Sequence, residues 1–135
     1  MNSNRLNPTF EGVNFTARNL TAKAVNDSGN SIAPAEKVVR VTGVATDAND
    51  WVTLPNIESV PLGHTLTILA SASSNFELRT PTASNSTINN VDSDGTQEYL
   101  VTDTDIVTIT KRTATGWIAQ SATFLGATRT AVIPD

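Results

Sequence analysis

The feature that most limits the fold of this chain is the absence of helical periodicity. No window of 11 or more residues places apolar side chains at spacings of three and four, whereas the second half consists of short runs rich in Thr, Val and Ile, separated by Gly and Pro. β-branched residues favour extended backbone because they pack well on a pleated surface. The sequence therefore predicts an all-β domain.

The expected strands are short and closely spaced, which is typical of an antiparallel β-sandwich or a jelly-roll-like domain. Within 65–72, Leu66 and Ile68 share one face with the following alanines, and within 105–112 Val107 and Ile109 do the same, so both strands are expected to be half-buried. We expect strands at 38–46, 50–54, 65–72, 75–80, 96–101, 105–112, 116–121 and 129–133.

Turn signals add one expected connection. The segment KRTATGW, Lys111 to Trp117, is typical of a hairpin, and we expect Gly116 to supply the positive φ that a tight reversal needs.

Residues 1–37 differ in kind from residues 38–135. They are rich in Asn, carry isolated aromatics at Phe10 and Phe15, and include the loop-like NDSGNS. Such a segment is expected to form an extended N-terminal arm, because it has too few apolar residues to offset its own ordering entropy. The sequence thus predicts two parts, an arm over 1–37 and a β-sandwich domain over 38–135.

Composition excludes several classes of function. The chain of 135 residues has no cysteine, which removes thiolate nucleophiles and Cys-bound zinc. Nine basic residues stand against 13 acidic ones, for a net charge of −4, and the basic residues do not cluster, which argues against nucleic acid as a partner. No apolar run is long enough to span a membrane, and the N-terminus lacks the apolar centre of a secretory signal.

The segment INNVDSDGTQEYL contains the D-x-D-G pattern with which many calcium loops begin. If Asn90, Asp92, Asp94 and Gly95 took loop positions 1, 3, 5 and 6, position 12 would be Val101 in place of the bidentate Glu that the motif requires. Asp-Gly is also a strong hairpin signal. We therefore expect a turn here and no metal site.

No residue cluster predicts an enzyme. His64 is the only histidine, and the sequence names neither a nucleophile nor a carboxylate to accompany it, so we expect a solvent-exposed turn histidine. Trp51 and Trp117 stand among apolar neighbours and are expected to pack in the core or a subunit interface, with a ligand-stacking surface as the alternative. No catalytic residue and no cofactor is expected.

The order of several short motifs resembles a small β-module of bacteriophage virion proteins. These motifs are WVTLP at 51–55, PLG at 61–63, TLTILASA at 65–72, FELRTP at 76–81, STIN at 86–89, VTITK at 107–111 and GW at 116–117. The resemblance covers roughly residues 51–121. Residues 1–37 have no counterpart in it, and ASASSN stands where the family has a longer polar turn.

The resemblance implies a non-enzymatic structural virion protein, most simply a capsid decoration (cement) protein on the outside of a phage head. It also implies a homo-oligomer, with a trimer favoured, a major capsid protein or other virion protein as partner, and assembly in the host cytoplasm. The resemblance does not include the arm, but from its composition we expect the capsid or subunit contacts to come from Phe10, Val13, Phe15 and Leu20. The alternative is a carbohydrate-binding or receptor-binding β-module of a phage fibre.

Overall fold

The computed structural model describes residues 17–25, 27–43, 50–71, 75–81, 85–90, 99–102, 105–123 and 128–129. Apart from one 3-10 turn, η2 (Ile57–Ser59), the secondary structure of these residues is β. The strands are β1 (Arg18–Thr21), β2 (Val38–Thr42), β3 (Trp51–Thr53), β4 (Thr65–Ala70), β5 (Phe76–Arg79), β6 (Thr87–Ile88), β7 (Tyr99–Val101), β8 (Ile106–Lys111), β9 (Gly116–Ala122) and β10 (Thr128–Arg129). The expected all-β class is confirmed.

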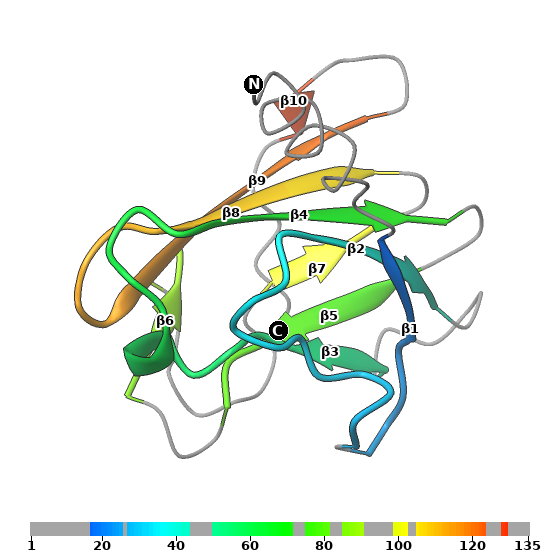
Figure 1. Cartoon of the computed structure of the whole chain (residues 1–135). Helices are drawn as coiled ribbons and strands as arrows, with labels where there is room; N and C mark the ends of the chain where they lie inside the picture. Colours follow the sequence, from blue (N-terminus) through cyan, green and yellow to red (C-terminus); the bar gives the residue numbers. More distant parts are fainter. Residues whose placement is uncertain are drawn as a thin grey trace, which may run out of the picture.

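The strands form two sheets. The larger, seven-stranded sheet has the order β1-β2-β4-β8-β9-β10, with β6 pairing with β9, and the smaller one has the order β3-β5-β7. Figure 1 shows the smaller sheet lying below the long strands β4 and β8 of the larger sheet. Each of the eight strand ranges expected from the sequence overlaps an observed strand.

The expectation of purely antiparallel pairing is wrong. The pairs β4–β8, β8–β9, β9–β10 and β5–β7 are antiparallel, but β1–β2, β2–β4, β3–β5 and β6–β9 are parallel. For β2–β4 and β3–β5 the cause is that the chain alternates between sheets from β2 to β5. Because β3 in the other sheet lies between β2 and β4 along the chain, the direction reverses twice and the two neighbours run the same way.

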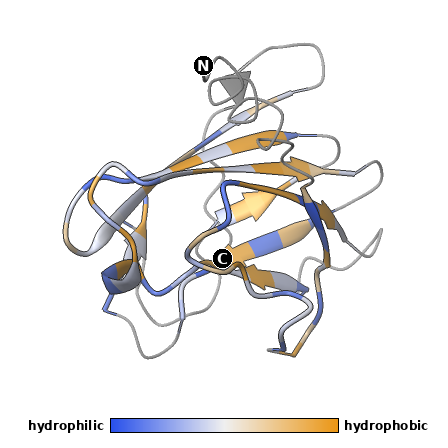
Figure 2. Cartoon of the chain, viewed as in Figure 1, coloured by the Kyte–Doolittle hydropathy of each residue, from blue (hydrophilic) through white to orange (hydrophobic). Residues whose placement is uncertain are grey.

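One hydrophobic core draws on both sheets. Leu66 and Ile68 of β4, and Val107 and Ile109 of β8, are fully buried, whereas Ile106 is 46% exposed, so the alternation expected for these two strands is confirmed. In Figure 2 the hydrophobic colour is concentrated on the strands of both sheets. The remaining core consists of Leu20, Ala22, Ile32, Val39, Val41, Val52, Leu54, Ile57, Val60, Phe76, Leu78, Ile88, Tyr99, Val101, Trp117 and Ala119.

The described part of the expected N-terminal arm belongs to the domain. β1 pairs with β2, and Leu20 at its centre is only 1% exposed. Leu20 therefore packs inside its own chain and is not the surface contact that we expected. The strand RNLT was missed because it holds a single apolar residue and shows no alternation. Phe10, Val13 and Phe15 lie outside the described residues, so the extended arm expected before residue 17 remains a prediction.

The expected hairpin between β8 and β9 is confirmed, but the role of its glycine is not the expected one. The Arg112 and Thr113 N–H groups donate to the Gly116 carbonyl at 2.9 and 3.2 Å. Among the described glycines, positive φ occurs at Gly63 (81°) and not at Gly116. A Cβ atom at Gly116 would instead lie 2.7 Å from the Thr113 Oγ1 atom, so a larger residue here would require the exposed Thr113 hydroxyl to turn away.

Candidate functional site

The outward face of the larger sheet carries a block of uncharged side chains. The strand registers arrange it in three rows across β4, β8 and β9, and no position in these rows is charged. We call this block the outer face; its rows are Thr65–Thr110–Ile118, Thr67–Thr108–Gln120 and Leu69–Ile106–Ala122.

Two observations make the outer face suited to contact with another surface. Ile106 and Ile118 are 46% and 40% exposed, and they are two of the four large hydrophobic residues with such exposure among the described residues. The Thr65 and Thr110 hydroxyls hydrogen-bond to each other at 3.1 Å, which satisfies part of their polarity within the sheet. The row Leu69–Ile106–Ala122 continues to the charged Arg40 on β2, at the edge of the face. Burying the nine positions themselves would desolvate no charged group, and it would remove apolar area from water.

A second candidate lies at the tip of the β8–β9 hairpin. A cavity of about 210 Å³ is lined by residues of β6, the hairpin turn and the start of β9. We call it the hairpin pocket; its lining residues are Thr87, Asn90, Arg112, Thr113, Thr115, Gly116, Trp117 and Ile118. Arg112 is the one charged residue among them.

Asn89 and Asn90 fix the rim of the hairpin pocket. Both have positive φ, at 52° and 65°, a conformation that Asn tolerates better than most residues. The Asn89 amide donates to the Ala119 carbonyl at 3.1 Å, and its Oδ1 atom accepts from the Ala119 N–H at 2.9 Å. The Asn89 side chain thus pairs with β9 as a strand backbone would, and it holds Asn90 in place beside the pocket.

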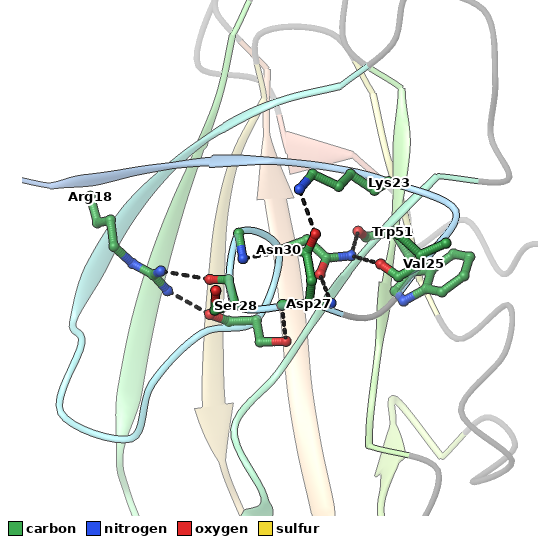
Figure 3. A network of polar contacts seen from close by, with 9 residues as sticks. Arg18, Lys23, Val25, Asp27, Ser28, Asn30 and Trp51 are labelled. Carbon is green, nitrogen blue, oxygen red and sulfur yellow. Dashed lines mark hydrogen bonds and ion pairs between the residues drawn. The ribbon is translucent and has the colours of Figure 1, made fainter.

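The loop between β1 and β2 contains a dense polar network (Figure 3). Asn30 is fully buried; its amide donates to the Val25 and Trp51 carbonyls at 2.8 and 3.0 Å, and its Oδ1 atom accepts from the Asp27 N–H at 2.9 Å. Gly29 and Lys23 complete the turn by donating to the Asp27 carboxylate at 2.6 Å each. These bonds fix the loop over β3, which gives it a structural role.

Arg18 closes the same loop from its other side. Its guanidinium donates to the Ser28 carbonyl at 2.9 Å, to the Ser31 carbonyl at 2.5 Å and to both Glu36 carboxylate oxygens at 2.6 and 2.9 Å. Burial raises the pKa of Glu36, but the hydrogen bonds from Arg18 and the Ala33 N–H outweigh it and leave that pKa below its ordinary value. A shallow depression of about 470 Å³ lies here, but its charged groups already bind each other, so we do not assign it a ligand.

His64 is not the exposed turn histidine that we expected. It is 4% exposed, and its ring meets Trp117 edge-on, with centroids 6.4 Å apart and planes at 76°. Within the described part of the chain, Lys37 is its one side-chain hydrogen-bond partner, so no nucleophile or carboxylate accompanies it there. Burial, and then the charges of Lys37 and Lys111, lower the pKa of His64. His64 directly precedes β4 in the sequence, and nothing in this position indicated that its side chain is buried.

The two tryptophans have different environments. Trp117 is fully buried, which confirms a packing role, although its indole Nε1 atom has no hydrogen-bond partner among the described residues. Trp51 is half-buried on the smaller sheet, where the Arg79 guanidinium lies 4.0 Å from the ring centroid. Arg79 also pairs with Glu77, and the two side chains are 13% and 4% exposed. The guanidinium covers one face of the Trp51 ring, and a ligand would have to displace it to stack there.

The acidic turn considered for calcium cannot be placed, because Asp92, Asp94 and Gly95 lie outside the described residues. Within the described ranges, no group of three or more His, Asp or Glu side chains is arranged to hold a metal ion. No helix in those ranges is long and apolar enough to cross a membrane.

Comparison with known proteins identifies no relative. No protein-family model matches the sequence, and no curated protein or solved structure matches the chain.

Proposed function

We propose that this chain is a non-enzymatic structural protein of a bacteriophage particle, of the decoration type, bound to the outside of the head as a homo-oligomer, with a trimer favoured. The sequence resemblance supports this proposal. Six of the seven motifs that carry it fall on β3, β4, β5, β6, β8 and the start of β9, and PLG lies in the turn before β4.

We further infer that the two sheets pack face to face as a sandwich. The shared core cluster supports this inference, because it takes side chains from β4 and β8 of one sheet and from β5 and β7 of the other. The hydrogen bond of 2.7 Å between the Tyr99 hydroxyl on β7 and the Ser121 hydroxyl on β9 also joins the two sheets. A rigid two-layer domain suits a protein that must hold its shape on a particle surface.

The outer face is the observation on which the decoration proposal rests. Its nine positions lack charge, and two exposed isoleucines lie among threonines. Interface centres are depleted in charged residues, and a specific interface takes about 20–30 residues a side. The outer face would therefore form the centre of a larger contact with the major capsid protein or with a second copy.

Co-sedimentation with stripped phage heads tests this proposal. Thr108 is exposed at the middle of the outer face, so Thr108→Arg should abolish co-sedimentation while the melting temperature stays unchanged. Glu58→Arg, exposed on η2, is the matched control and should co-sediment like the parent, because η2 is bound by Lys111, which lies one residue after Thr110 and so on the opposite face of β8. If Thr108→Arg binds normally, the outer face is not the contact. If the parent itself fails to bind any head preparation, the decoration role is wrong.

A carbohydrate-binding or receptor-binding module is the second candidate function. The hairpin pocket favours it, because this pocket gathers hydroxyls, an amide and a guanidinium around a small cavity. The tryptophans do not add to this candidate, since Trp117 is fully buried and Arg79 covers the Trp51 ring. A glycan array probed with the parent and with an Arg112→Gln variant separates the two functions, because a purely structural protein gives no signal that depends on Arg112.

A further inference from the structure

The positive charge of Arg112 in the hairpin pocket favours a negatively charged ligand. Arg112 is the one charged lining residue, and the others are neutral. Within the part of the chain that the structure describes, the Arg112 guanidinium makes no ion pair and no side-chain hydrogen bond, whereas Arg18 and Arg79 are both paired. A free guanidinium presents planar, parallel donors that match a carboxylate in bidentate geometry.

The neutral lining residues match the remainder of such a ligand. Thr87, Thr113 and Thr115 carry hydroxyls that both donate and accept, and the Asn90 amide does the same. Gly116 and the half-exposed Ile118 add an apolar area against which the C–H groups of a ring can pack. Alternating hydroxyl and C–H surfaces are the chemistry of a sugar ring.

The size of the pocket suits a single ring. Its volume of about 210 Å³ lies below the range of about 300–1,000 Å³ that is typical of sites for drug-sized molecules. The walls are also held in place before binding, by the Asn89–Ala119 pair on one side and by the Arg112–Gly116 and Thr113–Gly116 hydrogen bonds on the other. Such preorganisation reduces the ordering cost of binding.

We propose that the hairpin pocket binds one carboxylate-bearing sugar ring, such as a uronic acid residue of an acidic saccharide. Arg112 would pair with the carboxylate, and the three threonines and Asn90 would hydrogen-bond to the ring hydroxyls. This inference rests on the second candidate function, carbohydrate binding, and does not depend on attachment to a phage head. A peptide carboxylate is the competing ligand; it would pair with Arg112 but would bring no ring hydroxyls to the three threonines.

Amide chemical shifts of the ¹⁵N-labelled full chain, titrated with sodium glucuronate, test the proposal. We expect shifts at the Thr113, Thr115 and Gly116 amides, with glucose and acetate binding at least about tenfold more weakly, because each lacks one half of the recognition. Arg112→Gln should weaken glucuronate binding by a similar factor, and Arg112→Lys should restore only part of it. Arg40→Gln is the control, since Arg40 aligns with Ile106 and Ala122 at the opposite end of the hairpin strands.

The alternative outcomes separate the ligand class from the function. Equal binding of glucuronate and glucose, unaffected by Arg112→Gln, would overturn the acidic class and leave carbohydrate binding standing. Acetate or an N-acetylated dipeptide binding as tightly as glucuronate would show that the site recognises a carboxylate without a sugar. An absence of localised shifts with every sugar would overturn both the inference and the carbohydrate-binding function.

Discussion

The Lys37 ammonium lies 2.8 Å from the Nδ1 atom of His64, and this atom accepts the hydrogen bond only while the imidazole is neutral. The second ring nitrogen, Nε2, is buried and has no hydrogen-bond partner among the described residues. Protonation of His64 would therefore place the imidazolium in contact with the Lys37 ammonium. The burial of this one histidine makes the free energy of unfolding depend on pH.

Because the pKa of His64 is lowered from 6.5 in the folded state, the unfolded chain takes up its proton first as the pH falls. The stabilisation by neutral His64 should be complete above about pH 7 and should decline as the pH drops below about 6.5 toward the folded pKa. Urea unfolding between about pH 5.5 and 8 measures this slope. His64→Gln should flatten the curve in this range, whatever its absolute stability, and an unchanged slope would show that His64 does not titrate differently in the two states.

Trp117 is the largest fully buried side chain in the described core. Trp117→Ala should lower the free energy of unfolding by about 3–5 kcal/mol, because it leaves a cavity beside His64. Ile118→Ala, at the next position and 40% exposed, is the control and should cost less than about 1 kcal/mol. Chemical denaturation measures both, and a Trp117→Ala variant as stable as the parent would mean that the site collapses without loss.

The buried pair on the smaller sheet provides a third test. Arg79→Met removes both the ion pair with Glu77 and the contact with the Trp51 ring, and it leaves a buried carboxylate without a counter-charge. We expect a loss of about 3–5 kcal/mol. The double variant Glu77→Gln with Arg79→Met should recover much of this loss in a double-mutant cycle. Additive effects would show that the two side chains do not interact.

Two truncations test whether the N-terminal residues form a separate arm or belong to the folded domain. Deletion of residues 1–35 removes β1 and the buried side chains of Leu20, Ala22 and Ile32, so it should abolish the cooperative thermal transition. Deletion of residues 1–16 leaves every member of the described core and should keep that transition. If the shorter deletion unfolds the chain, residues 1–16 contribute to stability. If the longer one melts like the parent, β1 is dispensable.

The local pattern of the sequence predicted the strands that alternate clearly. Leu66 and Ile68, like Val107 and Ile109, point to the same face because side chains in a strand have a period of two, and this period is set by the backbone alone. β1 and β6 escaped prediction, because the first holds one apolar residue and the second spans two residues. The strand expected at 116–121 correctly placed the start of β9, but the positive φ expected at Gly116 is absent.

Only the tertiary structure decided which segments become neighbours. The parallel pairing of β2 with β4 depends on the passage of β3 through the other sheet, and no local pattern encodes that passage. The same holds for the hairpin pocket, which unites Asn90 with Arg112, and for His64, which contacts Trp117 and Lys37 from distant parts of the chain. The sequence by itself determined the β character and the faces of its regular strands, because these follow from nearest-neighbour geometry. Pairing, register, burial of polar groups and the assembly of a pocket depend on contacts between residues far apart in the chain, and the fold as a whole settles these.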